Sequence, residues 1–234
     1  MSIYIYRGRS KTYEKPQKQK KIEFLFENMC FIIVSSYPLD GVKSKGSKVL
    51  QKHLDSEVIE YNLDLFGSIC KNPEIIVISG ISGKEIIKHS RRQEYIVVEN
   101  SLFEFTNSAE DLRLGLLATR SPEVIFLDSS FIPVLDTLNL IKEDNNSKAF
   151  CKEEIDNKYD IGVLEGETGY ISSYTFTSQD KLTGMYYLNS QDVSRLRKKT
   201  CGSSFNKNKY AFEMFDEIKM KKINDTTNSI LVAR

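Results

Sequence analysis

The stretch Phe31-Ile32-Ile33-Val34-Ser35-Ser36-Tyr37 decides how the rest of the chain is interpreted. Its first four residues form a short apolar run rich in β-branched side chains, typical of a strand buried on both faces of a sheet. A loop of small, polar and flexible residues follows and ends at Lys48. In open α/β sheets, ligands bind beyond the carboxyl ends of strands, and a loop with lysines and free backbone N–H groups suits a phosphate. The plainer alternative is a surface connection that happens to contain lysine.

Three more apolar runs alternate with helical patterns in the first two thirds of the chain. The predicted strands are Glu74–Gly80, Tyr95–Val98 and Val124–Leu127. The predicted helices are one capped at Asp55-Ser56 and ending near Cys70, a short one after Gly83, one that starts at Thr106–Asp111 with Leu112, Leu116 and Leu117 inward, and Ile132–Lys142. This alternation indicates βαβ units around a mainly parallel sheet.

The pattern changes after residue 147. Short strands are predicted at Ile161–Leu164, Tyr170–Thr177 and Gly184–Leu188, helices at Gln191–Lys199 and Ala211–Lys222, and a last strand at Ile230–Val232. Short strands separated by turns favour an antiparallel extension. The predicted fold class is therefore α/β, with a Rossmann-like, mainly parallel sheet flanked by helices and a small antiparallel part. The predicted organisation is an N-terminal arm, residues 1–28, and a single domain, residues 29–234.

Composition excludes several classes of protein. With 40% hydrophobic and 28% charged residues and a net charge of +1, the 234-residue chain resembles an ordinary globular domain, for which nucleic acid is not expected as a partner. No apolar run approaches the about 18 residues of a membrane span, and the start lacks the apolar segment of a secretion signal. We therefore expect a cytoplasmic protein without a membrane partner. The four cysteines form no Cys-x-x-Cys pair and only two histidines accompany them, so reduced thiols are expected rather than a zinc site.

The N-terminal arm is basic, whereas the whole chain is nearly neutral. Residues 1–21 contain seven basic side chains, one acid and interleaved tyrosines. Such a segment can dock on an acidic protein partner or on phosphates. A solvated terminus is the alternative.

Three segments carry a resemblance to a known family. They are Val34-Ser35-Ser36-Tyr37 with Ser47-Lys48-Val49-Leu50, Val98-Glu99-Asn100 with Phe105-Thr106-Asn107-Ser108 and Asp111-Leu112, and Phe126-Leu127-Asp128-Ser129-Ser130. Together with the order of elements over residues 31–200, they resemble the nucleotidyltransferases of GT-A-like fold, which couple NTPs to sugar phosphates or phosphocholine.

The resemblance implies a site and its partners. The partners are an NTP and a phosphorylated small-molecule acceptor, with Mg²⁺ as the cofactor. Asp128 would hold the metal, and Lys48 would offset charge on the phosphoryl group that is attacked. The implied nucleotide-binding residues are Ser35, Ser36, Gly41, Lys43, Lys45, Asn100 and Asn107. Asn100 has the alternative role of holding a turn, and Asn107 that of capping a helix.

Two departures from the family pattern leave a second interpretation open. Tyr37-Pro38 stand where the family loop has glycine, and proline offers no N–H to a phosphate. Ser130 stands where the family's acidic turn has room for a second carboxylate. The alternative is a nucleotidyltransferase-fold protein that has lost catalysis and serves as a structural or interaction component, for example of a virus or phage, in which case it would be virion-associated.

Overall fold

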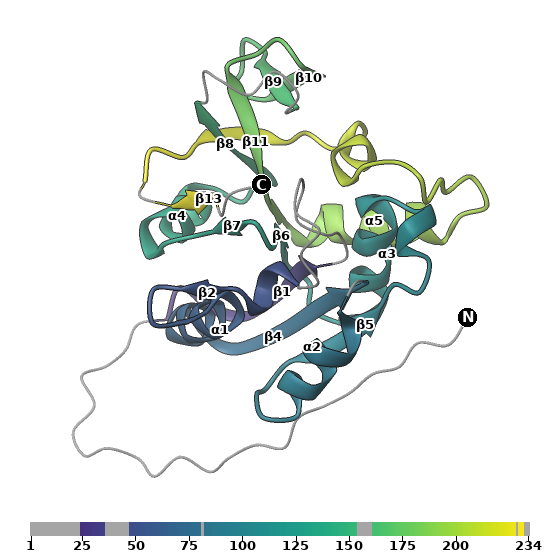
Figure 1. Cartoon of the computed structure of the whole chain (residues 1–234). Coiled ribbons are helices and arrows are strands. Elements are labelled where there is room, and N and C mark those ends of the chain that lie inside the picture. The colour runs from purple at the N-terminus through teal and green to yellow at the C-terminus, as the bar shows by residue number, and fades with distance from the viewer. Residues whose placement is uncertain (1–23, 36–46, 81, 154–160, 228, 232–234) are drawn as a thin grey trace.

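The computed structural model describes residues 24–35, 47–80, 82–153, 161–227 and 229–231 (Figure 1). Residues 1–23 of the predicted N-terminal arm and most of the predicted nucleotide loop lie outside this range. The predicted site residues outside it are Ser36, Gly41, Lys43 and Lys45.

Four parallel strands form the centre of the molecule, in the spatial order β5, β4, β1, β6 (Figure 1). They are β1 Phe26–Ser35, β4 Cys70–Ser79, β5 Ile96–Glu99 and β6 Val124–Asp128. Alternate side chains of β1 enter two separate cores, with Ile32 and Val34 on one face and Phe31 and Ile33 on the other. All four are at most 3% exposed. The prediction of a strand buried on both faces is confirmed, and so is the α/β fold class.

Helices cover both faces of this sheet. The helices α1 Val58–Ile69, α2 Gly83–Ser90 and α4 Leu135–Asn139 contribute to one core, and α3 Ser108–Ala118 and α5 Ser190–Cys201 to the other. Phe66 of α1 stacks on Phe31, with 3.9 Å between ring centroids. On the opposite face, α3 approaches β1 so closely that a Cβ on Gly115 would lie 2.7 Å from the Ile32 side chain. The two helical layers therefore hold β1 between them.

An antiparallel region extends the sheet beyond β6, as predicted. The long strand β11 Asp180–Leu188 pairs with β6, and β9 Gly162–Glu165 and β10 Ile171–Thr175 follow outward. The strand β8 Lys148–Glu153 also pairs with β11, and β12 Lys221–Asn224 runs parallel to β8. The remaining elements are β2 Lys52–His53 with β3 Ser56–Glu57, β7 Phe131–Ile132 with β13 Ile230–Leu231, and the 3₁₀ turns η1 Lys48–Leu50, η2 Phe103–Phe105, η3 Leu140–Glu143 and η4 Ala211–Phe215.

The predicted helix over Ala211–Lys222 is wrong. Only η4 is helical, and the segment continues into the strand β12. The cause is a long-range pairing, because β12 lies beside β8 with Lys221 opposite Lys148 and Asn224 opposite Cys151. These backbone hydrogen bonds outweigh the local helical pattern.

Two predicted helix starts also need correction. The first helix, α1, begins at Val58 rather than after Asp55-Ser56, because Glu57 and Glu60 form a capping box in which the Glu57 N–H donates to Glu60 Oε2 at 3.3 Å. The helix α4 begins at Leu135 rather than near Ile132, because Ile132 pairs with β13.

One predicted core position of α3 differs as well. Leu112 and Leu116 are buried as predicted, but Leu117 is 43% exposed and Leu114 is buried in its place. Because α3 lies between the sheet and α5, its buried surface is wider than a single stripe.

The order of strands determines where a ligand can bind. From β1 the chain moves outward to β4 and β5, and it then returns to place β6 on the other side of β1. In such open sheets, a crevice forms at the carboxyl ends of the two strands where the direction changes. Here that crevice lies beyond the ends of β1 and β6.

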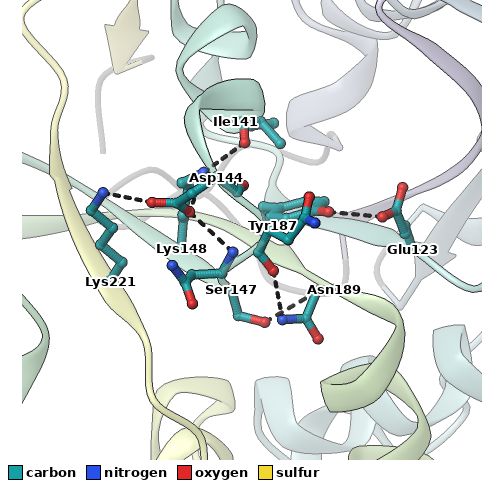
Figure 2. Close-up of polar contacts among 10 residues, drawn as sticks. Glu123, Ile141, Asp144, Ser147, Lys148, Tyr187, Asn189 and Lys221 are labelled. Atoms are coloured by element: carbon teal, nitrogen blue, oxygen red, sulfur yellow. Dashed lines mark hydrogen bonds and ion pairs between the residues drawn. The ribbon is translucent and has the colours of Figure 1, made fainter.

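A buried lysine connects several elements of the fold (Figure 2). Lys148, the first residue of β8, is fully buried. Its Nζ donates to the carbonyl oxygens of Ile141, at 2.6 Å, and Asp144, at 2.9 Å, and lies 3.0 Å from Asp144 Oδ1. Asp144 Oδ2 accepts a hydrogen bond from Lys221 of β12 at 2.6 Å. The network therefore joins η3, β8 and β12, with the Asp144 carboxylate between two lysine cations.

The Asp144 carboxylate predicts a pH dependence of stability. Burial alone raises the pKa of Asp144, but the hydrogen bonds from Lys221 and Lys148 outweigh it and hold the pKa well below the usual range. A pKa that is lower in the folded state stabilises the protein above the unfolded-state value of about 3.9, and this contribution is lost as the pH falls further. Asp144→Asn should therefore cost about 2 kcal/mol at pH 7 and progressively less below about pH 4. Urea unfolding of both proteins from pH 3 to 8 measures this, and a constant difference would contradict it.

Candidate active site

A cavity of about 410 Å³ lies at the predicted crevice. Its walls come from β1, β6, β11, the start of α3 and the segment 210–212. The residues that carry the argument are Val34, Ser108, Asp128, Gly184, Tyr186 and Phe212. Segments far apart in the sequence therefore meet at the carboxyl edge of the parallel strands.

Asp128 is the charged group of this cavity. It ends β6 and pairs in register with Val34 of β1. Its Oδ1 accepts the backbone N–H of Ser130 at 2.8 Å and the Ser130 hydroxyl at 2.5 Å. Among the described residues that line the cavity, no other side chain carries a formal charge. A carboxylate held in this way could ligate a divalent cation.

Gly184 in β11 lies against this carboxylate. It has a φ of +86°, and the register of β11 against β8 shifts between Leu182 and Tyr186. Thr183 stabilises the irregularity, since its hydroxyl donates to the Phe150 carbonyl at 3.0 Å and accepts the Met185 N–H at 3.2 Å. A Cβ on Gly184 would lie 2.7 Å from the Asp128 Cβ. We did not predict this role, although a glycine inside a strand pattern indicates a bulge or a close approach.

Replacing Gly184 with alanine should therefore destabilise the protein and displace Asp128. The left-handed backbone and the 2.7 Å contact both oppose a side chain, and together we expect a loss of about 2–4 kcal/mol. The matched control is Gly67→Ala in α1, where nothing lies within 4 Å of the added methyl group. There we expect a gain of about 0.5–1 kcal/mol, because alanine favours the helix. Denaturant unfolding of both variants measures the difference, and equal effects would contradict the contact.

Lys48 directly follows the predicted nucleotide loop in sequence and lies close to the end of β1. The hydroxyls of Ser35 and Ser47 are 2.5 Å apart, and this hydrogen bond ties the start of η1 to the end of β1. Lys48 is only 8% exposed. Its ammonium makes no hydrogen bond or ion pair with any residue in the described parts of the chain. A lysine in that situation suits an anionic ligand.

The two predicted asparagines lie at the same edge but are engaged in the structure. The Asn100 amide, after β5, donates to Thr106 at 3.0 Å and to Asp111 at 2.9 Å, and its oxygen accepts the Leu102 N–H at 3.1 Å. These hydrogen bonds agree with the alternative role of Asn100, which is to hold the turn after β5.

Asn107 precedes α3, but its side chain makes no capping hydrogen bond and donates instead to the Asn208 carbonyl at 2.8 Å. Its neighbour Ser108 lines the cavity.

An aromatic wall of Phe176, Tyr210 and Phe212, which we did not predict, lines part of the cavity. The Tyr210 ring stacks on Phe212, with 5.7 Å between centroids, and Phe212 lies 5.0 Å from Tyr174. Phe176, also on the lining, is 60% exposed. Burial raises the pKa of the Tyr186 phenol well above its usual range, so this lining residue stays neutral. The wall offers apolar and π surface to a ligand.

The described residues contain no group of three or more His, Cys, Asp or Glu side chains placed to hold a metal ion. No helix among them is long and apolar enough to cross a bilayer. All four cysteines are free thiols.

Comparison with known proteins supports the fold assignment. No family model and no curated protein sequence matches the chain. Among solved structures, it is similar to the inositol-1-phosphate CTP transferase from T. maritima, with 15% identity, a TM-score of 0.65 and 87% of this chain and 89% of that chain covered. The CTP:phosphocholine cytidylyltransferase from Streptococcus pneumoniae gives 15% identity, a TM-score of 0.66 and coverages of 88% and 92%. The nucleoside-diphosphate-sugar pyrophosphorylase from Vibrio cholerae gives 12%, 0.59, 86% and 95%. The chain therefore has the nucleotidyltransferase fold that its sequence predicts.

Proposed function

We propose that this chain is a nucleotidyltransferase. A phosphate oxygen of a phosphorylated acceptor would attack the α-phosphorus of an NTP, forming a new P–O bond as the bond to the β-phosphate oxygen breaks and pyrophosphate leaves. The observation that supports this best is Asp128, which ends β6 inside the cavity at the strand-order reversal of a nucleotidyltransferase fold. We place this reaction in the cytoplasm, where NTPs are available.

We assign the residue roles as follows. Asp128 would hold Mg²⁺, which when bound neutralises phosphate charge in the transition state. Lys48, with Lys43 or Lys45, would contact the phosphates of the nucleotide. The other proposed nucleotide contacts are Ser35, Ser36, Gly41, Asn100 and Asn107. The side chains of Asn100 and Asn107 already make hydrogen bonds within the protein. These two residues would therefore contact the nucleotide through their backbone, or after their side chains rearrange.

The cavity lining favours one type of acceptor. A sugar needs several hydrogen-bonding partners, whereas this lining is dominated by aromatic and aliphatic side chains around one carboxylate. Aromatic faces attract a compact cationic group, and this attraction does not need the carboxylate assigned to Mg²⁺. We therefore propose an amino-alcohol phosphate as the acceptor, as in the phosphocholine enzyme among the structural neighbours.

Pyrophosphate release tests the proposal. The purified chain is incubated with Mg²⁺, each of CTP, UTP, GTP and ATP, and a panel containing phosphocholine, inositol 1-phosphate and sugar 1-phosphates. We expect release with one nucleotide, greatest with a cationic acceptor. No release with any pair, from a folded protein, would favour the structural or interaction role. Deletion of residues 1–21 then tests that role, since it predicts loss of assembly with a protein partner while the core stays folded.

A further inference from the structure

The dipeptide Asn-Ser stands at the start of both α3 and α5, but the two helices use it differently. At α5 the Asn189 side chain caps its own helix, because its Oδ1 accepts the Asp192 N–H at 2.9 Å. At α3 the Asn107 side chain makes no such bond, and its amide donates instead to the Asn208 carbonyl at 2.8 Å. The start of α3 is therefore engaged with a segment that lies 101 positions away in the sequence.

We call this segment, residues 206–212, the strap. Two of its carbonyls take the place of the missing side-chain cap. The Asn107 N–H donates to the Lys207 carbonyl at 3.0 Å, and the Ala109 N–H donates to the Lys209 carbonyl at 3.1 Å. The first N–H groups of a helix have no partner inside the helix, so they need acceptors from elsewhere. The strap supplies these acceptors, and α3 in return fixes the backbone of the strap.

Ser108 ties the strap to α3 at the cavity itself. Its Oγ accepts the Ala211 N–H at 2.8 Å, and both residues line the cavity. Ala211 is only 3% exposed, so its N–H would lose its acceptor, with little access to water, if Ser108 lost the hydroxyl. The residues on either side of Ala211 are Tyr210 and Phe212, two members of the aromatic wall. The Ser108 hydroxyl therefore fixes the backbone from which both rings project.

We propose that Ser108 is a positioning residue for recognition of the acceptor. Through its hydrogen bond to Ala211 it holds Tyr210 and Phe212 where their rings can face a compact cationic group. This inference rests on the proposed function, because it takes the acceptor to bind against the aromatic wall. Specificity for the acceptor then depends on the tie between α3 and the strap as well as on the rings.

Acceptor kinetics of the full chain test this role, with phosphocholine as the probe. Ser108→Ala should raise the KM for phosphocholine about tenfold and leave kcat and the KM for the NTP unchanged. Ser108→Thr keeps the hydroxyl and should restore the KM. The control is Ser190→Ala at the same position of α5, where the hydroxyl makes no hydrogen bond with any described residue. An unchanged KM in Ser108→Ala, or an equal rise in Ser190→Ala, would overturn the inference but leave the proposed function intact.

A double-mutant cycle separates positioning from direct contact with the acceptor. Phe212→Ala should raise the KM for phosphocholine by itself, because it removes one ring of the wall. If Ser108 acts through this wall, adding Ser108→Ala should raise the KM by less than about twofold more. A full tenfold addition would mean that Ser108 contacts the acceptor directly, and the positioning role would be wrong.

Amide hydrogen exchange tests the tie without any substrate. In Ser108→Ala the amides of residues 209–212 should exchange at least about tenfold faster than in the unmodified protein, while those of α5 stay unchanged. Unchanged exchange in the strap would overturn the inference whatever the activity. If the unmodified chain releases no pyrophosphate with any acceptor, the proposed function fails and the acceptor role of Ser108 fails with it. Hydrogen exchange then still decides whether the tie between α3 and the strap exists.

Discussion

Replacing Asp128 with asparagine is expected to reduce pyrophosphate release at least about 100-fold. The substitution removes the only formal charge among the described residues that line the cavity. It keeps the shape of the side chain and an oxygen that can accept the Ser130 N–H. A loss of this size would therefore report the charge rather than the architecture. The measurement is kcat with saturating nucleotide and Mg²⁺, together with the thermal melting temperature.

The control for this substitution is an acid remote from the cavity. Asp136 in the first turn of α4 is exposed and does not line the site, so Asp136→Asn should leave kcat unchanged. An Asp128→Asn variant that retained activity within a factor of about ten would contradict a role in holding Mg²⁺.

Lys148→Ala is expected to lower the free energy of unfolding by about 3–5 kcal/mol. The fully buried ammonium is bonded to two carbonyl oxygens and to the Asp144 carboxylate (Figure 2). Its removal leaves the carbonyl oxygens without this donor and takes one of two lysine partners from Asp144. Lys148→Met keeps most of the packing of the side chain, so its smaller loss should isolate the contribution of the charge. Urea unfolding at pH 7 measures all three proteins.

Lys221 provides the matched control, because it bonds the same carboxylate from a partly exposed position. Lys221→Ala should destabilise the protein clearly less than Lys148→Ala. Equal losses would mean that burial of Lys148 adds nothing to the network.

The parallel half of the fold could be predicted because each strand has a recognisable sequence pattern of its own. The strands β1, β4, β5 and β6 are runs of Val, Ile and Leu separated by helical patterns, and burial on both faces requires such runs. Asp128 was a candidate for the same reason, since it directly follows one of these runs. The local sequence pattern was therefore enough to predict the role of residues whose role depends on their position along a strand.

The remaining features depend on contacts across long sequence distances. The strand β8 follows a polar segment and is stabilised by β11 and β12, which lie far along the chain. The contact between Gly184 and Asp128 arises only when β11 pairs with β6. The aromatic wall arises only when Phe176 and the segment 210–212 meet at the cavity. Hydrophobic periodicity in the sequence does not predict these long-range contacts.

A crystal structure with the preferred NTP and Mg²⁺ tests the central claim most directly. The account predicts the triphosphate in the cavity between the ends of β1 and β6, with a metal ion bound to Oδ2 of Asp128 and the Lys48 ammonium at a phosphate. A nucleotide bound elsewhere, or a cavity that stays empty at saturating nucleotide, would contradict it.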